Sequence, residues 1–168
     1  MNRSQFFKQS LGVAATSLLV PDLFHRTFTN DPEPYKMELI KDFVGAGHGR
    51  IERLKELVAD FPNIIYCRYD WGNGDFEDAI EAAAHVGNKE IANFLIEKGA
   101  RPNLFVLTML GRNDLVVPIL EAYPILLNGL GAHGFTLLHH ALKGGDDASE
   151  MVTYLASKGL TETQVKIK

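Results

Sequence analysis

A short pattern that returns four times along the chain constrains its fold more than any other feature. The clearest copy spans residues 83–103 and begins with two alanines, with Gly87 three positions after the second one. An apolar stripe at helical spacing follows the glycine. Lys98 and Gly99 then supply the cation and the glycine that commonly end a helix. Each copy is therefore predicted to form two short antiparallel helices, which bury their apolar faces only when the next copy packs against them.

The other three copies keep this register. Each places a glycine after its first helix, and these glycines lie at positions 49, 87, 111 and 145, which are 38, 24 and 34 residues apart. Compared with the third interval of 34 residues, the first interval, between Gly49 and Gly87, is lengthened, and the second, between Gly87 and Gly111, is shortened. The second helices end alternately at a proline and at a Lys-Gly pair, namely at Pro62, Lys98-Gly99, Pro124 and Lys158-Gly159.

The last copy contains a recognisable signature. The run Thr136-Leu137-Leu138-His139-His140-Ala141 resembles the Thr-Pro-Leu-His-x-Ala motif of ankyrin repeats, with Leu137 in place of the proline. The resemblance implies an all-α ankyrin-repeat solenoid of about four helix-turn-helix units. It also implies a binding surface rather than a catalyst, and a structural role for His139, which bonds between turns in that family.

The resemblance divides the chain into four segments: an export segment at 1–30, a linker at 31–35, the ankyrin repeat domain at 36–160 and a C-terminal tail at 161–168. In the first segment, Arg3 and Lys8 precede the apolar run 11–20, an order typical of a signal peptide. This order resembles a degenerate twin-arginine signal in which Ser4 replaces the second arginine. We expect a periplasmic or secreted protein, by either the twin-arginine or the general route. The alternative is a cytoplasmic protein with an amphipathic N-terminal helix.

Composition narrows the classes of partner. The net charge is −4, and no basic stripe is present, which argues against nucleic acid as a ligand. No apolar run approaches the ~20 residues of a membrane span. Cys67 is the only cysteine, so neither an internal disulfide nor a cysteine-based metal site is expected. We expect a monomer that binds a protein partner.

The most distinctive segment lies in the lengthened first interval, at residues 68–78. It contains the only tryptophan, Trp71, two turn glycines and several carboxylates. Tryptophan, tyrosine and arginine dominate binding hot spots, so the segment is interpreted as a partner-binding finger. Alternatively, Trp71 and Phe76 pack onto the helices while Asn73-Gly74 makes a tight turn. A calcium loop is disfavoured because Gly72 stands where an oxygen ligand belongs.

The histidines do not form a recognisable metal motif. His48 and His85 fall near the ends of first helices in adjacent copies, and His140 lies on the first helix of the last copy. They occupy no equivalent repeat position, and no His-Glu-x-x-His spacing exists. The glycines around His48 are better explained by a helix-ending turn than by a phosphate loop. We therefore expect no metal ligands, no cofactor and no catalytic residues.

The sequence thus predicts a non-catalytic protein-protein interaction module that binds through its concave face and the finger loop. An alternative is a small-molecule or metal binder, or an accessory subunit of a co-exported enzyme, using the notch left by the shortened third copy. The candidate protein-binding residues are Tyr69, Trp71, Asn73, Asp75, Phe76, His85 and Met109. Met109 is included because a missing finger should leave its helix uncovered.

Overall fold

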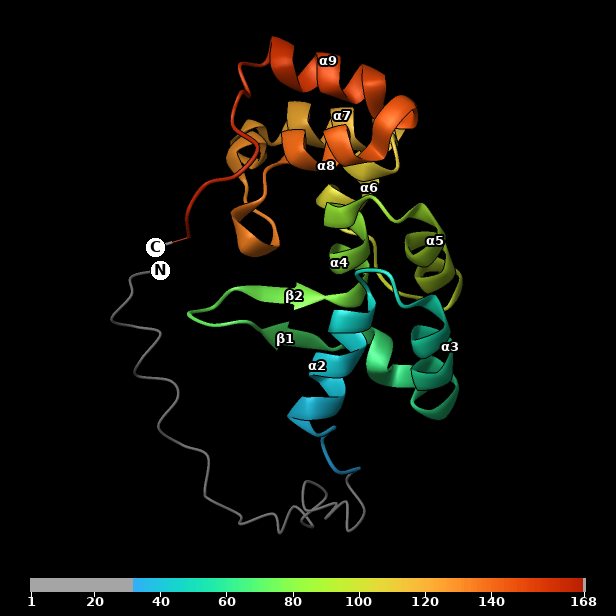
Figure 1. Cartoon of the computed structure of the whole chain (residues 1–168). Coiled ribbons are helices and arrows are strands. Elements are labelled where there is room, and N and C mark those ends of the chain that lie inside the picture. The colour runs from blue at the N-terminus through green and yellow to red at the C-terminus, as the bar shows by residue number, and fades with distance from the viewer. Residues whose placement is uncertain (1–31, 168) are drawn as a thin grey trace, which may run out of the picture. The chain divides into compact units, whose positions relative to one another are not determined.

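The computed structural model of the chain describes residues 32–167, and the compact unit that begins at Pro34 is mostly helical (Figure 1). The expected export segment at 1–30 lies outside the described residues. Within residues 32–167, no helix combines the length and the apolar character needed to cross a bilayer.

Four pairs of helices occupy the positions of the four sequence copies. The first pair is α2 (Met37–Ala46) with α3 (Ile51–Asp60), and the second is α4 (Ala79–Val86) with α5 (Lys89–Glu97). The third is α6 (Leu104–Met109) with α7 (Asn113–Ala122), and the fourth is α8 (Leu137–Gly144) with α9 (Ser149–Ser157). The first helices pack in chain order, α2 on α4, α4 on α6 and α6 on α8, and α4 also contacts α8.

Capping residues and glycines explain where these helices begin and end. Asp78 caps α4 through a reciprocal capping box with Glu81, and Thr136 caps α8 by accepting from the backbone N–H of His139. Gly87 ends α4 in the left-handed region, with φ 80° and ψ 21°, as the sequence predicted. Its backbone lies so close to α8 that an added Cβ would stand 2.6 Å from the carbonyl oxygen of Lys143.

The connections between the pairs differ in length as the glycine spacing indicated. Between α3 and α4, the 3-10 helix η1 (Pro62–Tyr66) leads into a hairpin of β1 (Arg68–Asp70) and β2 (Phe76–Asp78), which are antiparallel. Asn73 and Gly74 turn the hairpin with φ values of 56° and 81°. Between α5 and α6, Asn103 directly caps α6 and no hairpin forms.

The last connection replaces a hairpin by two short turns, the 3-10 helices η2 (Pro124–Asn128) and η3 (Ala132–Gly134). In Figure 1 the β1–β2 hairpin projects to one side of α4, and α3 and α5 lie on the opposite side. Asp75 in the hairpin turn contacts His133 in η3, so these two connections meet although they are far apart in sequence.

The apolar faces of the helices form two core clusters. One gathers side chains of α2 to α6, and the other gathers side chains of α7 to α9 with α8 at its centre. Met109, which was expected to be uncovered, is fully buried. The expectation of an exposed Met109 is wrong because α6 packs against α8 on one side and α4 on the other, so the absent hairpin exposes little of the helix.

Candidate metal centre

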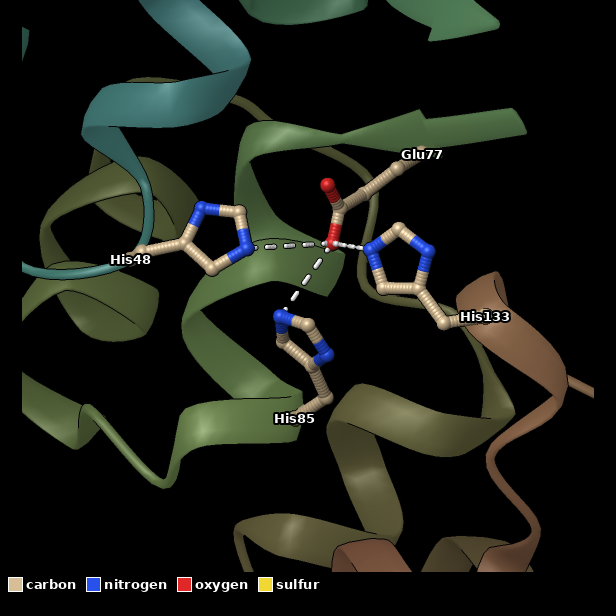
Figure 2. Close-up of side chains that lie close together, drawn as sticks. All are labelled: His48, Glu77, His85 and His133. Carbon is tan, nitrogen blue, oxygen red and sulfur yellow. Dashed lines mark ion pairs between the residues drawn. The ribbon is translucent and has the colours of Figure 1, made fainter. Parts of the chain in front are cut away.

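Four side chains from four different elements converge beside α4 (Figure 2). His48 lies in the turn after α2, Glu77 on β2, His85 in the last turn of α4 and His133 in η3. One potential ligand atom of each residue lies within 4.8 Å of those of all the others. The elements that carry them are brought together by the packing of α2 and α8 on α4 and by the contact between the hairpin and η3.

Glu77 Oε1 is the centre of this arrangement. It lies 3.3 Å from His85 Nε2, 3.6 Å from His133 Nε2 and 3.7 Å from His48 Nε2. Glu77 is completely buried and His85 is 8% exposed, whereas His48 and His133 reach solvent. Glu77 and His85 therefore form the buried side of the cluster, and His48 and His133 form its partly exposed side.

The buried residues Glu77 and His85 contain side-chain polar atoms that have no hydrogen-bond partner. Among the described residues, the buried side-chain atoms without a partner are Glu77 Oε1, both ring nitrogens of His85 and Asn113 Oδ1. Three of these four atoms belong to the cluster. Because buried polar atoms in folded proteins are almost always bonded, a concentration of orphaned atoms at one point indicates a missing partner. Two of these atoms, Glu77 Oε1 and His85 Nε2, face each other, and a carboxylate oxygen and an unprotonated imidazole nitrogen both bind cations.

The opposite sides of three of the four ligands are tied to the protein. His133 Nδ1 lies 2.7 Å from Asp75 Oδ2, and the indole Nε1–H of Trp71 donates to Glu77 Oε2 at 2.7 Å. His48 Nδ1 lies 3.3 Å from the carbonyl oxygen of Gly45. Each contact leaves the other heteroatom of the ligand pointing at the centre, as Figure 2 shows for His48, Glu77 and His133. Outer contacts of this kind orient the ligands of metal sites.

Burial disfavours the charged forms of the cluster's side chains. It raises the pKa of Glu77 to about 7, despite the hydrogen bond from Trp71. It also lowers the pKa of His85 to about 3, with help from the neighbouring imidazoles, and lowers the pKa of His48. Burial of Asp75 opposes its ionisation, but two hydrogen bonds from His133 keep the pKa of that carboxyl below its usual value. A bound cation would stabilise both ionised Glu77 and the neutral imidazoles.

Sequence reasoning found only part of this cluster. Asp75, Trp71 and His85 were selected as partner-binding residues, and His48 was considered and set aside because the histidines share no repeat position. His133 was missed, since it lies outside the repeated pattern. Its one local signal is its place directly before Gly134 in the sequence.

The remaining candidate surface residues lie mainly on the hairpin. Trp71 is 38% exposed and Phe76 is 47% exposed, Tyr69 is half-buried with its ring edge-to-face with Trp71, and Asn73 lies at the exposed turn. His85 is buried and faces Glu77, so it is not available to a protein partner at the surface. The structure therefore groups four of the seven candidates on the hairpin and its turn, with Phe76 on the face opposite Tyr69 and Trp71. It places Asp75 and His85 at the cluster.

Comparison with known proteins adds one partial similarity. No protein-family model matches the chain. Over 87 residues the chain is 37% identical to alpha-latrocrustotoxin-Lt1a of Latrodectus tredecimguttatus, a match that covers 46% of this chain and 6% of the toxin. The chain thus spans only a small part of that protein's length.

Proposed function

We propose that this chain is an ankyrin-type repeat protein that holds a divalent transition-metal ion between His48, Glu77, His85 and His133. The observation that carries the metal site is the convergence of buried, unpartnered Glu77 Oε1 and His85 Nε2 with two further imidazoles. The repeat assignment is supported by four helix pairs in the predicted register and by the packing of successive first helices on one another.

The ligand set selects the class of ion. Three imidazole nitrogens and one carboxylate oxygen suit zinc, nickel, copper or iron, whereas magnesium and calcium prefer oxygen ligands throughout. A tetrahedral zinc ion with bonds of about 2.0–2.1 Å keeps its ligand atoms about 3.4 Å apart. The separations of 3.3, 3.6 and 3.7 Å from Glu77 Oε1 to the three nitrogens are close to that spacing, and all the ligand atoms lie within 4.8 Å of one another. We therefore name zinc as the first ion to test.

The ion would cross-link parts of the fold that are distant in sequence. Its ligands come from the first unit, from the hairpin and α4 of the second unit, and from the connection before the fourth. Four protein ligands are typical of a structural zinc site, which contributes to folding energy. The proposed role of the metal is therefore to stabilise the stack and to fix the hairpin.

Metal titration of the purified chain tests this function. We expect the chain, freed of metal by chelation, to bind one equivalent of Zn²⁺ in isothermal titration calorimetry. The variant His133→Asn tolerates the left-handed backbone of that position. It removes a direct ligand, so it should bind at least about tenfold more weakly, the loss typical of removing only an outer partner of a ligand. His140→Gln is the matched control because it also removes an imidazole, but one whose ring nitrogen bonds to the backbone of Thr136. The proposal fails if the wild type binds no zinc or if His133→Asn binds as well as the control.

A second proposed function, which the exposed aromatic residues favour, is recognition of a protein partner by an exported, non-catalytic module. Phe76 is 47% exposed, on the hairpin face opposite Trp71, and large exposed aromatics are typical of interface anchors. Phe76→Ser tests it better than a change at Trp71, because the Trp71 indole also bonds Glu77. Affinity capture from the envelope fraction should recover a partner with the wild type and lose it with Phe76→Ser. Equal recovery by both chains would place any partner surface elsewhere.

A further inference from the structure

The turn that carries His133 has an unusual backbone. His133 has φ 59° and ψ 15°, and among the described non-glycine residues only Asn73 shares a positive φ. Gly134 follows with φ 74°. Left-handed backbone is uncommon outside glycine, although asparagine and histidine adopt it more readily than most residues, and it persists where the surroundings hold it. The His133 ring reaches Glu77 from this conformation, so whatever holds the turn also places the ring.

The C-terminal segment Thr163–Val165 holds one side of this turn. Gln164 Nε2–H donates to the carbonyl oxygen of His133 at 2.9 Å, and the backbone N–H of Val165 donates to the carbonyl oxygen of Gly134 at 2.9 Å. Gln164 also forms an antiparallel bridge with Phe135. The fit is tight, because a Cβ added to Gly134 would fall 1.9 Å from the carbonyl oxygen of Val165.

Asp75 holds the other side. Its carboxylate accepts from the backbone N–H of His133 at 2.7 Å and contacts His133 Nδ1 at 2.7 Å. The other three ligands have supports of their own. His85 belongs to α4, Glu77 to a buried position of β2, and His48 to the turn that ends the first helix of the stack. His133 is therefore the ligand whose position depends on the end of the chain.

We infer that the segment Thr163–Val165 is a positioning element that sets the affinity of the metal site through His133. The inference rests on the proposed metal-binding function and extends it to a part of the chain that contributes no ligand. Without the segment, the carbonyl groups of His133 and Gly134 lose their donors and the turn can relax to ordinary backbone angles. Nε2 of His133 then leaves the position facing Glu77 Oε1, and three ligands remain. Removal or displacement of residues 163–165 would thus weaken metal binding.

Two shortened chains test the inference. One ends at Glu162 and lacks the whole segment. It keeps an oxygen acceptor at Glu162 for the Thr136 hydroxyl, and it loses the Thr163 carbonyl that accepts from the Thr136 backbone N–H. The matched control ends at Val165 and keeps both hydrogen bonds to the turn. Both are titrated with Zn²⁺ and with Co²⁺, whose visible absorption reports the number and geometry of its ligands. We expect the chain ending at Glu162 to bind about tenfold to hundredfold more weakly, with an altered Co²⁺ spectrum, and the control to match the full chain.

The outcomes separate the two proposals. If the full chain binds no metal, the proposed function and this inference both fail. If the full chain and the chain ending at Glu162 bind equally and give the same Co²⁺ spectrum, only the positioning role fails. Thermal unfolding of the metal-free chains supplies the remaining control. A purely structural tail would lower the unfolding temperature without changing the Co²⁺ spectrum of the chain that remains folded, and that result would also overturn the inference.

Discussion

At the scale of the residue, Glu77 has opposite effects on stability and on metal binding. Its carboxylate is fully buried, and burial raises its pKa to about 7, so ionising it in the metal-free protein is costly. Glu77→Gln removes that cost, and the amide can donate to the unpartnered His85 Nε2. At pH 8 we expect metal-free Glu77→Gln to be more stable by roughly 1–3 kcal/mol, and to bind Zn²⁺ more weakly than the wild type.

Chemical denaturation with a chelator present measures the first effect, and calorimetry measures the second. The expectation is different if the Glu77 carboxylate serves only to hold the neighbouring histidines in place. In that case Glu77→Gln would lower the stability of the metal-free chain, because the neighbours would lose their charged partner. A destabilised variant therefore speaks against a metal site and for a structural Glu77. A variant that is more stable but binds metal less well is the pattern expected where function is retained at the expense of stability.

His140 gives a pH dependence that is separate from the metal site. It is 2% exposed, and burial lowers its pKa to about 4, against an ordinary value of about 6.5. Between these values the unfolded chain takes up a proton that the folded chain does not, so the folded state loses stability as the pH falls. The full loss for this shift is about 3 kcal/mol.

The test compares the pH profile of the wild type with that of His140→Gln, because the other titrating groups then largely cancel. We expect the free energy of unfolding of the wild type to fall more steeply than that of the variant between about pH 6.5 and 4. Profiles that run parallel through this interval would show that His140 does not remain neutral in the folded protein.

At the scale of the element, the hairpin depends on its contacts with the cluster. Each strand has three residues, and a two-stranded hairpin of that size is marginal in water by itself. Trp71 bonds Glu77, and its ring centroid lies 6.2 Å from that of His133, so the only tryptophan of the chain stands beside the proposed ion. Nickel bound at the site should therefore quench Trp71 fluorescence with the same affinity that calorimetry reports.

Zinc is the internal control, since it binds the same ligands but does not quench by that route. Adding excess zinc should restore the emission by displacing nickel, and His133→Asn should weaken the quenching. Quenching that appears only at nickel concentrations far above the calorimetric affinity would mean that the ion binds elsewhere.

The close packing of helix ends makes a second element-scale prediction. Gly87 has φ 80°, and an added Cβ would stand 2.6 Å from the Lys143 carbonyl oxygen at the end of α8. Gly159 has a similar φ of 91° but open space around it. We expect Gly159→Ala to cost about 1 kcal/mol of unfolding free energy, from backbone strain alone. Gly87→Ala should cost roughly 2–4 kcal/mol, because α4 and α8 must also separate. Equal losses in urea denaturation would show that α4 and α8 are not in tight contact.

At the scale of the whole molecule, the helical character and the ends of several helices could be predicted from the sequence, and the cluster of His48, Glu77, His85 and His133 could not. The glycines at 87, 111 and 145 have positive φ, and Asn103 runs directly into α6, because local backbone geometry and capping depend on neighbours in sequence. The cluster depends instead on contacts between units. His133 lies 48 residues or more from each of the other three ligands, in a connection whose backbone is set by Asp75 and Gln164. Only folding makes these residues neighbours, so spacing along the chain gave no metal motif.

This separation along the chain leads to a prediction about cooperativity. Stacked units are coupled mainly to their neighbours, so an ion shared by the first, second and fourth units adds coupling that the helices alone do not supply. Zinc at one hundred times its dissociation constant should stabilise the folded chain by about 2.7 kcal/mol. Because Trp71 reports the hairpin and circular dichroism reports the helices, we expect both thermal transitions to rise together when zinc is added. In His133→Asn the ion no longer reaches the fourth unit, so the rise should be smaller. A zinc-dependent rise of only the transition seen by Trp71 fluorescence, and not of the one seen by circular dichroism, would restrict the ion's effect to the hairpin. That result would contradict the proposal that the ion cross-links the helix pairs.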